Sequence, residues 1–199
     1  MISRENFFEE KIKEIAKEKN ILDIGSGYKF QGFLKYKKYF ERCKYTTIDS
    51  RKKFNPDILA DIHNIPLPDN SLDAVICKSV LQFVKNPFKA VDEIFRVLKP
   101  NGKCLVYVPF LYIYHGGLSD SERDYWRFSI DGINELFRKF KKIEICHTKG
   151  HFETAANILP QKYNFITKLI TFVANFLDKK TSRFQSGKQS SGYIVFLIK

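Results

Sequence analysis

Short apolar runs alternate with amphipathic segments along the chain. The runs are rich in β-branched residues and stop at glycine or aspartate, which is typical of buried strands. They predict strands at 20–24, 45–48, 57–60, 72–77, 103–108, 142–147 and 193–198. Apolar residues three and four positions apart predict helices over 5–19, from Pro87 to about Pro100, and over 129–140.

Strands that alternate with helices predict an α/β fold with a doubly wound, mainly parallel seven-stranded sheet. The length suits one domain over residues 1–199. A helical apolar insertion is expected at about 151–190, before the last strand.

The most apolar part of this insertion is 157–177. In a helix that begins at Gln161, its polar residues form one narrow stripe, which contains Asn164, Lys168, Thr171 and Asn175. The segment is too short, and Lys168 too central, for a transmembrane span, whereas the Lys179, Lys180 and Arg183 that follow are typical of an interfacial anchor. Three alternatives remain: a lid or homodimer contact, docking on a membrane surface, or plain core packing.

The chain has 34 Lys and Arg against 22 Asp and Glu, a net charge of +12. With 44% hydrophobic residues it is not a disordered chain. The excess charge lies in 28–53, with 9 basic and 2 acidic residues, and in 151–199, with 7 and 2. In 28–53 the aromatic residues Tyr36, Tyr39, Phe40 and Tyr45 lie among the lysines, but their roughly helical spacing is more typical of a core than of an RNA platform. An anionic surface or substrate is therefore expected rather than nucleic acid. Lysine used only for solubility is the alternative.

The four cysteines and four histidines form no zinc or disulfide pattern, so no metal site is predicted. The N-terminus opens no apolar signal region. We therefore expect the protein in the cytoplasm or at the periphery of the membrane.

Glycines follow the first strand in the segment Asp23-Ile24-Gly25-Ser26-Gly27, and Asp49-Ser50 ends the second strand. At that edge of the sheet the glycines allow close approach of a ligand, and the Asp49 carboxylate can accept from two ribose hydroxyls. Phe30 stands where the dinucleotide pattern has its third glycine. This favours a nucleoside ligand without a pyrophosphate, although a strand-to-helix turn needs glycine in any case.

Five segments resemble the class I S-adenosylmethionine-dependent methyltransferases, and more narrowly their UbiE-like, methyltransferase type 11 branch. They are 21–27, 47–49, 60–62, 65–75 and 94–102. The resemblance implies a Rossmann-like fold with an antiparallel last strand, and S-adenosylmethionine as cofactor. Leu81-Gln82-Phe83-Val84 stands where the family often has Leu-Glu-His-Val, which excludes a mechanism through that acid and imidazole.

The resemblance also implies roles for individual residues. Asp23 and the turn of Gly25, Ser26 and Gly27 would hold the methionine part, with Lys78 beside it. Asp49, with Ser50, would bind the ribose, and Asp61 the adenine amino group, with Ile62 alongside. Alternatively, Asp61 caps a turn and Lys78 is a solvated strand end.

The acceptor side is expected after the fifth strand, in 109–117 and 124–129. This stretch resembles one found in methyltransferases of cell-surface glycan and nucleotide-sugar pathways. We expect His115 to act as a base or to orient the acceptor, Arg127 to bind an anionic group, and Tyr125 to wall the pocket with Trp126. The alternatives are core packing of the aromatic residues and internal pairing of Arg127 with Asp124 or Asp131.

The expected function is therefore methyl transfer from S-adenosylmethionine to a small-molecule, sugar or lipid-linked acceptor, at oxygen. An RNA methyltransferase and a catalytically silent cofactor-binding protein are the alternatives. No Asn-Pro-Pro-Tyr-like motif follows the fourth strand, which argues against amino-methylation of nucleic-acid bases.

Overall fold

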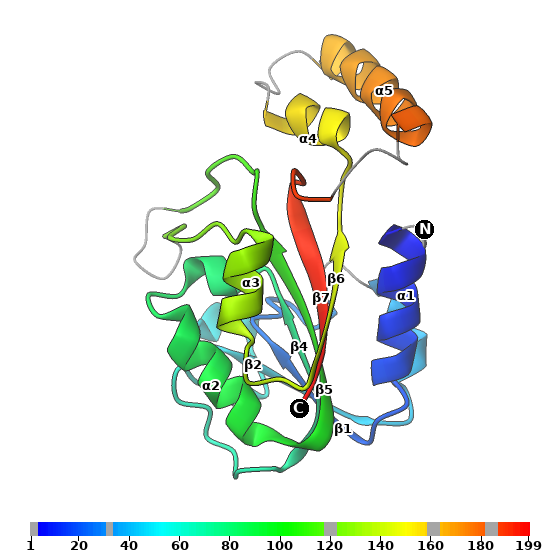
Figure 1. The fold of residues 1–199 in the computed structure, drawn as a ribbon. Helices are drawn as coiled ribbons and strands as arrows, with labels where there is room; N and C mark the ends of the chain where they lie inside the picture. The colour runs from blue at the N-terminus through cyan, green and yellow to red at the C-terminus, as the bar shows by residue number, and fades with distance from the viewer. Residues whose placement is uncertain (1–3, 31–33, 118–122, 159–163, 182–186) are drawn as a thin grey trace.

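A computed structural model describes residues 4–30, 34–117, 123–158, 164–181 and 187–199. Its strands form one seven-stranded sheet in the order β3-β2-β1-β4-β5-β7-β6 (Figure 1). The strands are β1 (Asn20–Ile24), β2 (Lys44–Asp49), β3 (Ile58–Leu59), β4 (Leu72–Lys78), β5 (Leu98–Pro109), β6 (Lys142–His147) and β7 (Gly192–Ile198). All neighbours are parallel except β7, which lies antiparallel between β5 and β6. The predicted fold class is confirmed.

Helices cover both faces of the sheet, and successive residues of β4 face the two resulting cores in turn. Ala74 and Ile76 face a core shared with α1 (Arg4–Ile15). Val75 and Cys77 face the opposite core, shared with α2 (Pro87–Val97) and α3 (Ile130–Leu136). β4 is therefore buried on both sides, which explains its continuous apolar run.

Several boundaries differ from the predicted ones. β5 begins at Leu98, directly after α2, because the chain bends at Asn101 (φ 64°) and resumes pairing with β4 after a register shift. α3 ends at Leu136, four residues before the predicted end. The 3₁₀ turns η1 (Leu34–Phe40), η2 (Lys52–Phe54) and η3 (Leu81–Phe83) had no predicted counterpart as elements.

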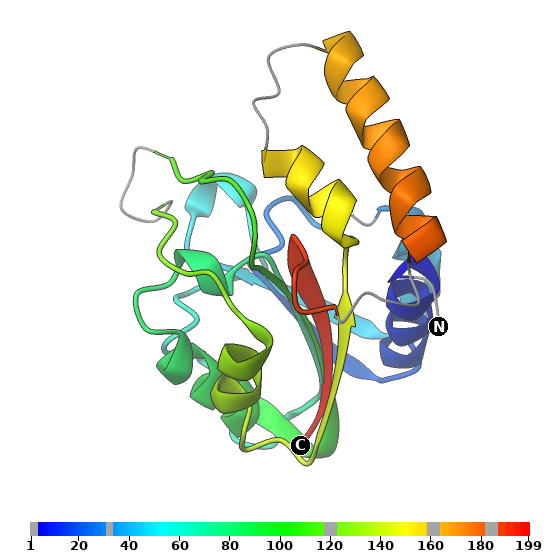
Figure 2. The ribbon, with the colours of Figure 1, turned by 45° about the horizontal axis from the view of Figure 1, so that its top comes forward.

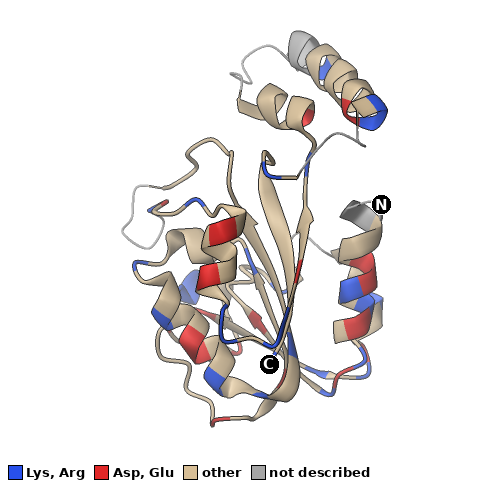
Figure 3. Cartoon of the chain, in the orientation of Figure 1, with Lys and Arg blue, Asp and Glu red and all other residues tan. Residues whose placement is uncertain are grey.

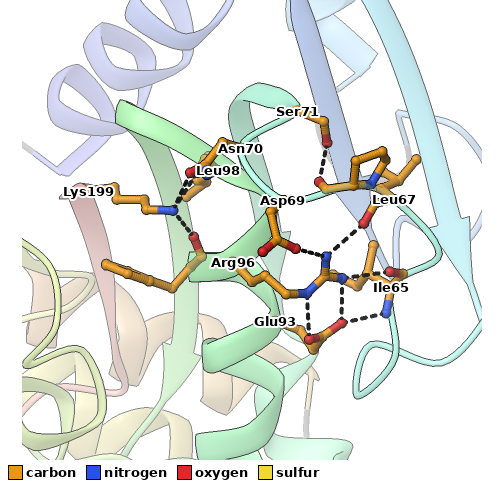
Figure 4. A network of polar contacts seen from close by, with 11 residues as sticks. Ile65, Leu67, Asp69, Asn70, Ser71, Glu93, Arg96, Leu98 and Lys199 are labelled. Atoms are coloured by element: carbon orange, nitrogen blue, oxygen red, sulfur yellow. Dashed lines mark hydrogen bonds and ion pairs between the residues drawn. The ribbon is translucent and has the colours of Figure 1, made fainter.

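A network of polar contacts attaches the loop between β3 and β4 to helix α2 (Figure 4). The guanidinium of Arg96 donates to the carbonyls of Ile65 and Leu67 and forms ion pairs with Asp69 and Glu93. Beside it, the Lys199 ammonium donates to the Asn70 side chain and to two carbonyls at the end of α2. The 65–75 and 94–102 segments of the sequence therefore meet in space.

Two further helices, α4 (His151–Ile158) and α5 (Asn164–Thr181), lie between β6 and β7 in the chain. They pack on each other beyond the ends of these strands (Figure 2). They fall in the predicted insertion, whose residues 159–163 and 182–186 lie outside the described part; a single domain over 1–199 stays a prediction. None of the described helices is long and apolar enough to cross a membrane.

Candidate active site

A cleft of about 690 Å³ opens where β1, β2 and β4 end. β1 and β4 start the two halves of the sheet, so the cleft lies at the topological switch point, the usual ligand site of such folds. Six residues named from the sequence line it: Gly25, Asp49, Ser50, Asp61, Ile62 and His115. Asp23, Ser26, Gly27, Lys78, Tyr125 and Arg127 are not among the lining residues.

Gly25 brings the end of β1 against the turn that follows β4. Its φ of +63° lies in the left-handed region, and a Cβ atom there would overlap the side chain of Val80. Its N–H donates to the Ile48 carbonyl at 2.7 Å, which ties the turn to β2. Only glycine fits this position without displacing Val80.

The Asp49 carboxylate has one oxygen in use and one unpartnered. Oδ1 accepts from the Arg51 backbone N–H at 2.9 Å and from its Nε at 3.3 Å. Oδ2 is buried and has no hydrogen-bond partner among the described residues. Because a buried acceptor without a donor costs about 1–3 kcal/mol, a ligand hydroxyl at the cleft would be favourable there. This fits the ribose of S-adenosylmethionine.

Asp23 lies behind the glycine turn rather than on the cleft wall. Its carboxylate is buried and accepts from the Tyr45 hydroxyl at 2.6 Å. Burial raises the pKa of Asp23 to about 7, although the Tyr45 hydrogen bond and the charge of Lys78 oppose that rise. Burial in turn lowers the pKa of Lys78. Asp23 therefore interacts with Tyr45 and Lys78 and does not line the cleft.

Asp61 caps a turn and also lines the cleft. Its Oδ1 accepts from the backbone N–H of His63 at 2.7 Å and lies 2.5 Å from Nδ1 of the same residue, so it caps a turn. Burial works against ionisation, but these His63 contacts lower the pKa of Asp61. Both side chains line the cleft, so the adenine role stays a prediction.

His115 reaches the cleft from the loop after β5. Its ring makes edge contacts with Phe83 and Tyr112, at centroid distances of 5.2 and 5.4 Å. Its Nδ1 lies 3.4 Å from Oδ2 of Asp124, whose side chain has no exposed surface. The backbone N–H of His115 donates to the same oxygen at 3.1 Å. A cleft imidazole is therefore backed by a buried carboxylate.

Arg127 holds the same loop from the other side. Its two terminal nitrogens each lie 2.5 Å from an Asp124 oxygen, and it also donates to the Ile113 carbonyl at 3.0 Å. Burial opposes ionisation of Asp124, but the Arg127 and His115 hydrogen bonds outweigh it and lower its pKa. The guanidinium is thus engaged internally, which favours the pairing alternative with Asp124 over a direct contact with the acceptor.

Tyr125 and Trp126 attach this loop to the turn after β4. Their backbone N–H groups donate to the Gln82 carbonyl, and the indole N–H of Trp126 donates to the Val84 carbonyl at 2.8 Å. Both side chains are half exposed. Their contacts position the His115 loop, and a pocket-wall role for Tyr125 stays a prediction.

Sequence reasoning missed part of the cleft. Arg51, His63, Ser79, Val80 and Lys85 also line it, whereas Gly116 and Gly117 belong to the predicted acceptor segment 109–117. Most come from loops directly after strands that the sequence did predict, so proximity to a strand end was the available signal. Asp124 was considered only as a partner of Arg127, and its contact with His115 was not foreseen.

Comparison with known proteins agrees with this geometry. Residues 22–106 match the family described as "Methyltransferase domain" (Methyltransf_11). An uncharacterized protein of Methanocaldococcus jannaschii is 34% identical over 101 residues, which cover 49% of this chain and 44% of that protein. The demethylmenaquinone methyltransferase of Clavibacter sepedonicus is 40% identical over 58 residues, 29% of this chain and 22% of the relative. The chain thus matches less than half the length of either relative.

Among solved structures, a SAM-dependent methyltransferase from Archaeoglobus fulgidus superposes with a TM-score of 0.63. The match covers 97% of this chain and 91% of that one at 15% identity, so it bears on the fold alone. The domain match over residues 22–106, the sheet order and the cleft all agree with the class I S-adenosylmethionine-dependent methyltransferases of the UbiE-like type, and they support the function proposed below.

Proposed function

We propose that the protein transfers a methyl group from S-adenosylmethionine to a hydroxyl oxygen of a small-molecule, sugar or lipid-linked acceptor. The observation that carries the proposal is the His115–Asp124 pair at the cleft, with Nδ1 and Oδ2 at 3.4 Å. A hydroxyl is a weak nucleophile until a base takes its proton, and a histidine held by a carboxylate is suited to that task. The name of the Clavibacter relative also indicates a small-molecule acceptor.

When bound, the cofactor supplies a methyl group on a good leaving group, a sulfonium. The chain's own residues then have two tasks. Asp49 and the Gly25 turn hold the nucleoside so that the methyl group is fixed in one place. His115 accepts the hydroxyl proton as the oxygen–methyl bond forms and the sulfur–methyl bond breaks.

Asp124 supports this step without touching the acceptor. Its Oδ2 faces Nδ1 of His115, which leaves Nε2 as the nitrogen able to take a proton. Because its pKa is lowered, Asp124 stays ionised and stabilises the imidazolium that forms. We therefore assign Asp124 as a positioning residue and His115 as the base.

Two cationic side chains, Arg51 and Lys85, line the cleft. Arg51 is paired with Asp49, which leaves Lys85 as the cation proposed for the acceptor. A phosphate or carboxylate on the acceptor would meet this ammonium group. This supports an anionic acceptor, with Lys85 in place of the Arg127 expected from the sequence.

The test is methyl transfer from methyl-labelled cofactor to a pool of hydroxylated small molecules, separated into phosphorylated and neutral fractions. We expect label in an alkali-stable methyl ether, with His115→Ala reducing turnover at least about a hundredfold and leaving cofactor affinity unchanged. Label on carbon or nitrogen would overturn the oxygen assignment. Cofactor binding without turnover in any fraction would support the silent alternative.

A further inference from the structure

Helix α5 presents its apolar side to solvent. Leu169, Phe172, Val173 and Phe176 are 56%, 72%, 47% and 60% exposed. Their spacing of three, one and three residues places them on one stripe, which we call the outer face of α5. A helix on the surface of a soluble domain normally has the opposite arrangement, with this stripe against the core.

The orientation of α5 is set by a side-chain contact with α4. Asp178 accepts from the backbone N–H groups of Phe152 and Glu153 at 3.0 and 2.8 Å, and so caps the first turn of α4. Ala174, on the same side of α5, is buried. Rolling the helix to hide its outer face would break this cap and expose Ala174, so the outer face is held outward.

The charge around the outer face has one sign. Lys168, Lys179 and Lys180 are exposed on α5, and its one acidic residue, Asp178, is the α4 cap (Figure 3). An apolar stripe beside lysines complements a surface that offers both hydrocarbon and negative charge. It does not complement itself, because a second copy would bring its own lysines to the same contact.

The position of α5 relative to the cleft fits such a surface. β6 runs parallel to β5, since both pair antiparallel with β7, and α4 follows the carboxyl end of β6. The α4–α5 pair therefore stands at the same edge of the sheet as the cleft (Figures 1 and 2). A surface bound there lies on the acceptor side of the molecule.

We propose that the outer face of α5 binds the surface of an anionic phospholipid bilayer. Leu169, Phe172, Val173 and Phe176 enter the boundary of the acyl chains, and the lysines meet the headgroups. The helix lies in the plane of the surface, as amphipathic interfacial helices do. Lysines near an anionic surface strengthen binding by about fivefold each, which makes the interaction sensitive to salt.

The test is sedimentation of the whole protein with vesicles of phosphatidylcholine and phosphatidylglycerol, against vesicles of phosphatidylcholine alone. We expect binding to the anionic vesicles at low salt that weakens as salt rises. The double variant Phe172→Ser/Phe176→Ser should lower the partition coefficient by roughly a hundredfold, about tenfold for each ring. The Lys168→Gln/Lys180→Gln variant should remove the preference for phosphatidylglycerol.

Phe88→Ser is the matched control, since Phe88 is a similarly exposed phenyl ring on α2. It should bind vesicles as the wild type does. All these side chains are exposed, so melting temperatures should stay unchanged and separate loss of binding from loss of folding.

No binding to anionic vesicles, or equal binding by the α5 and α2 variants, would overturn the proposal. A stable dimer that Phe172→Ser/Phe176→Ser dissociates, without vesicle binding, would assign the face to a second copy. None of these readouts depends on methyl transfer.

Discussion

Oδ2 of Asp124 lies 3.4 Å from Nδ1 of His115 and accepts a hydrogen bond from the His115 backbone N–H at 3.1 Å. The buried carboxylate therefore orients both the imidazole and the loop that carries it. Phe83 and Tyr112 contact the ring from two sides, so its place at the cleft is fixed by packing as well as by charge. The pair sits nine residues apart in sequence, across the segment 118–122 that lies outside the described residues.

Replacing Asp124 by Asn should separate its effect on His115 from its effect on the fold. Loss of the negative charge leaves the imidazolium unsupported, so turnover should fall by roughly a hundredfold, while the dissociation constant of the cofactor stays the same. Steady-state rates and calorimetric titration measure the two quantities. Arg127→Met is the comparison, because it breaks the same clamp but keeps the His115–Asp124 contact. If Arg127→Met lowers turnover as much as Asp124→Asn does, Asp124 has only a structural role.

Asp49 is expected to control cofactor affinity. Its buried Oδ2 has no partner among the described residues, and a hydrogen bond to a charged group contributes about 1.5–3 kcal/mol. Asp49→Ala should therefore weaken cofactor binding by roughly 10- to 100-fold. Asp92 is an exposed carboxylate on α2 that pairs with Lys139. Asp92→Ala should leave cofactor affinity unchanged. Equal affinity in both variants would contradict the ribose assignment.

The raised pKa of Asp23 predicts a definite pH dependence of stability without cofactor. With a folded pKa of about 7 and an unfolded value near 3.9, the folded state holds a proton that the unfolded state loses. The free energy of unfolding should therefore decrease as pH rises from about 4 to about 7, by at most about 4 kcal/mol from this group, and level off above.

Urea unfolding of the wild type and of Asp23→Asn across this range measures the effect. The difference between the two proteins should grow from pH 4 to 7 in favour of the variant. A difference that is constant with pH would show that Asp23 ionises normally.

Arg96 is expected to stabilise the fold without any part in the reaction. Its planar guanidinium donates to two carbonyls and forms ion pairs with two carboxylates at once. A lysine ammonium cannot make this set of contacts, because it lacks the planar arrangement of five N–H donors. Arg96→Lys should lower the free energy of unfolding by about 2–3 kcal/mol. Chemical unfolding measures the loss, and cofactor affinity below the transition should match the wild type. A change of less than about 0.5 kcal/mol would show that the network is mostly solvent-screened.

The central strands of the sheet were predictable because they are buried on both sides. The run at 20–24 matches β1 to the residue, because Gly25 stops it, and the run at 142–147 matches the partly buried edge strand β6. The start of β5 was missed because Pro100-Asn101-Gly102 is typical of a turn, and only pairing with β4 extends the strand across it. η1 was missed because its seven residues are too few for a clear periodic pattern.

The site was predictable where the backbone alone defines it. Gly25, Asp49 and Asp61 follow strand ends, and strand ends meet at one edge of a parallel sheet. Arg127 and Tyr125 were harder, because their roles depend on which partner a folded loop brings near. The residue types around Arg127 predicted that it binds an anionic group of the acceptor. In the folded protein its guanidinium instead forms an ion pair with Asp124.

A crystal structure with S-adenosylmethionine bound would test the central claim most directly. We predict a ribose hydroxyl within about 3 Å of Asp49 Oδ2, and the sulfonium methyl directed into the space beside His115, with Nε2 close enough to reach an acceptor hydroxyl on that methyl. A ribose that does not contact Asp49, or a methyl group directed away from His115, would contradict the account.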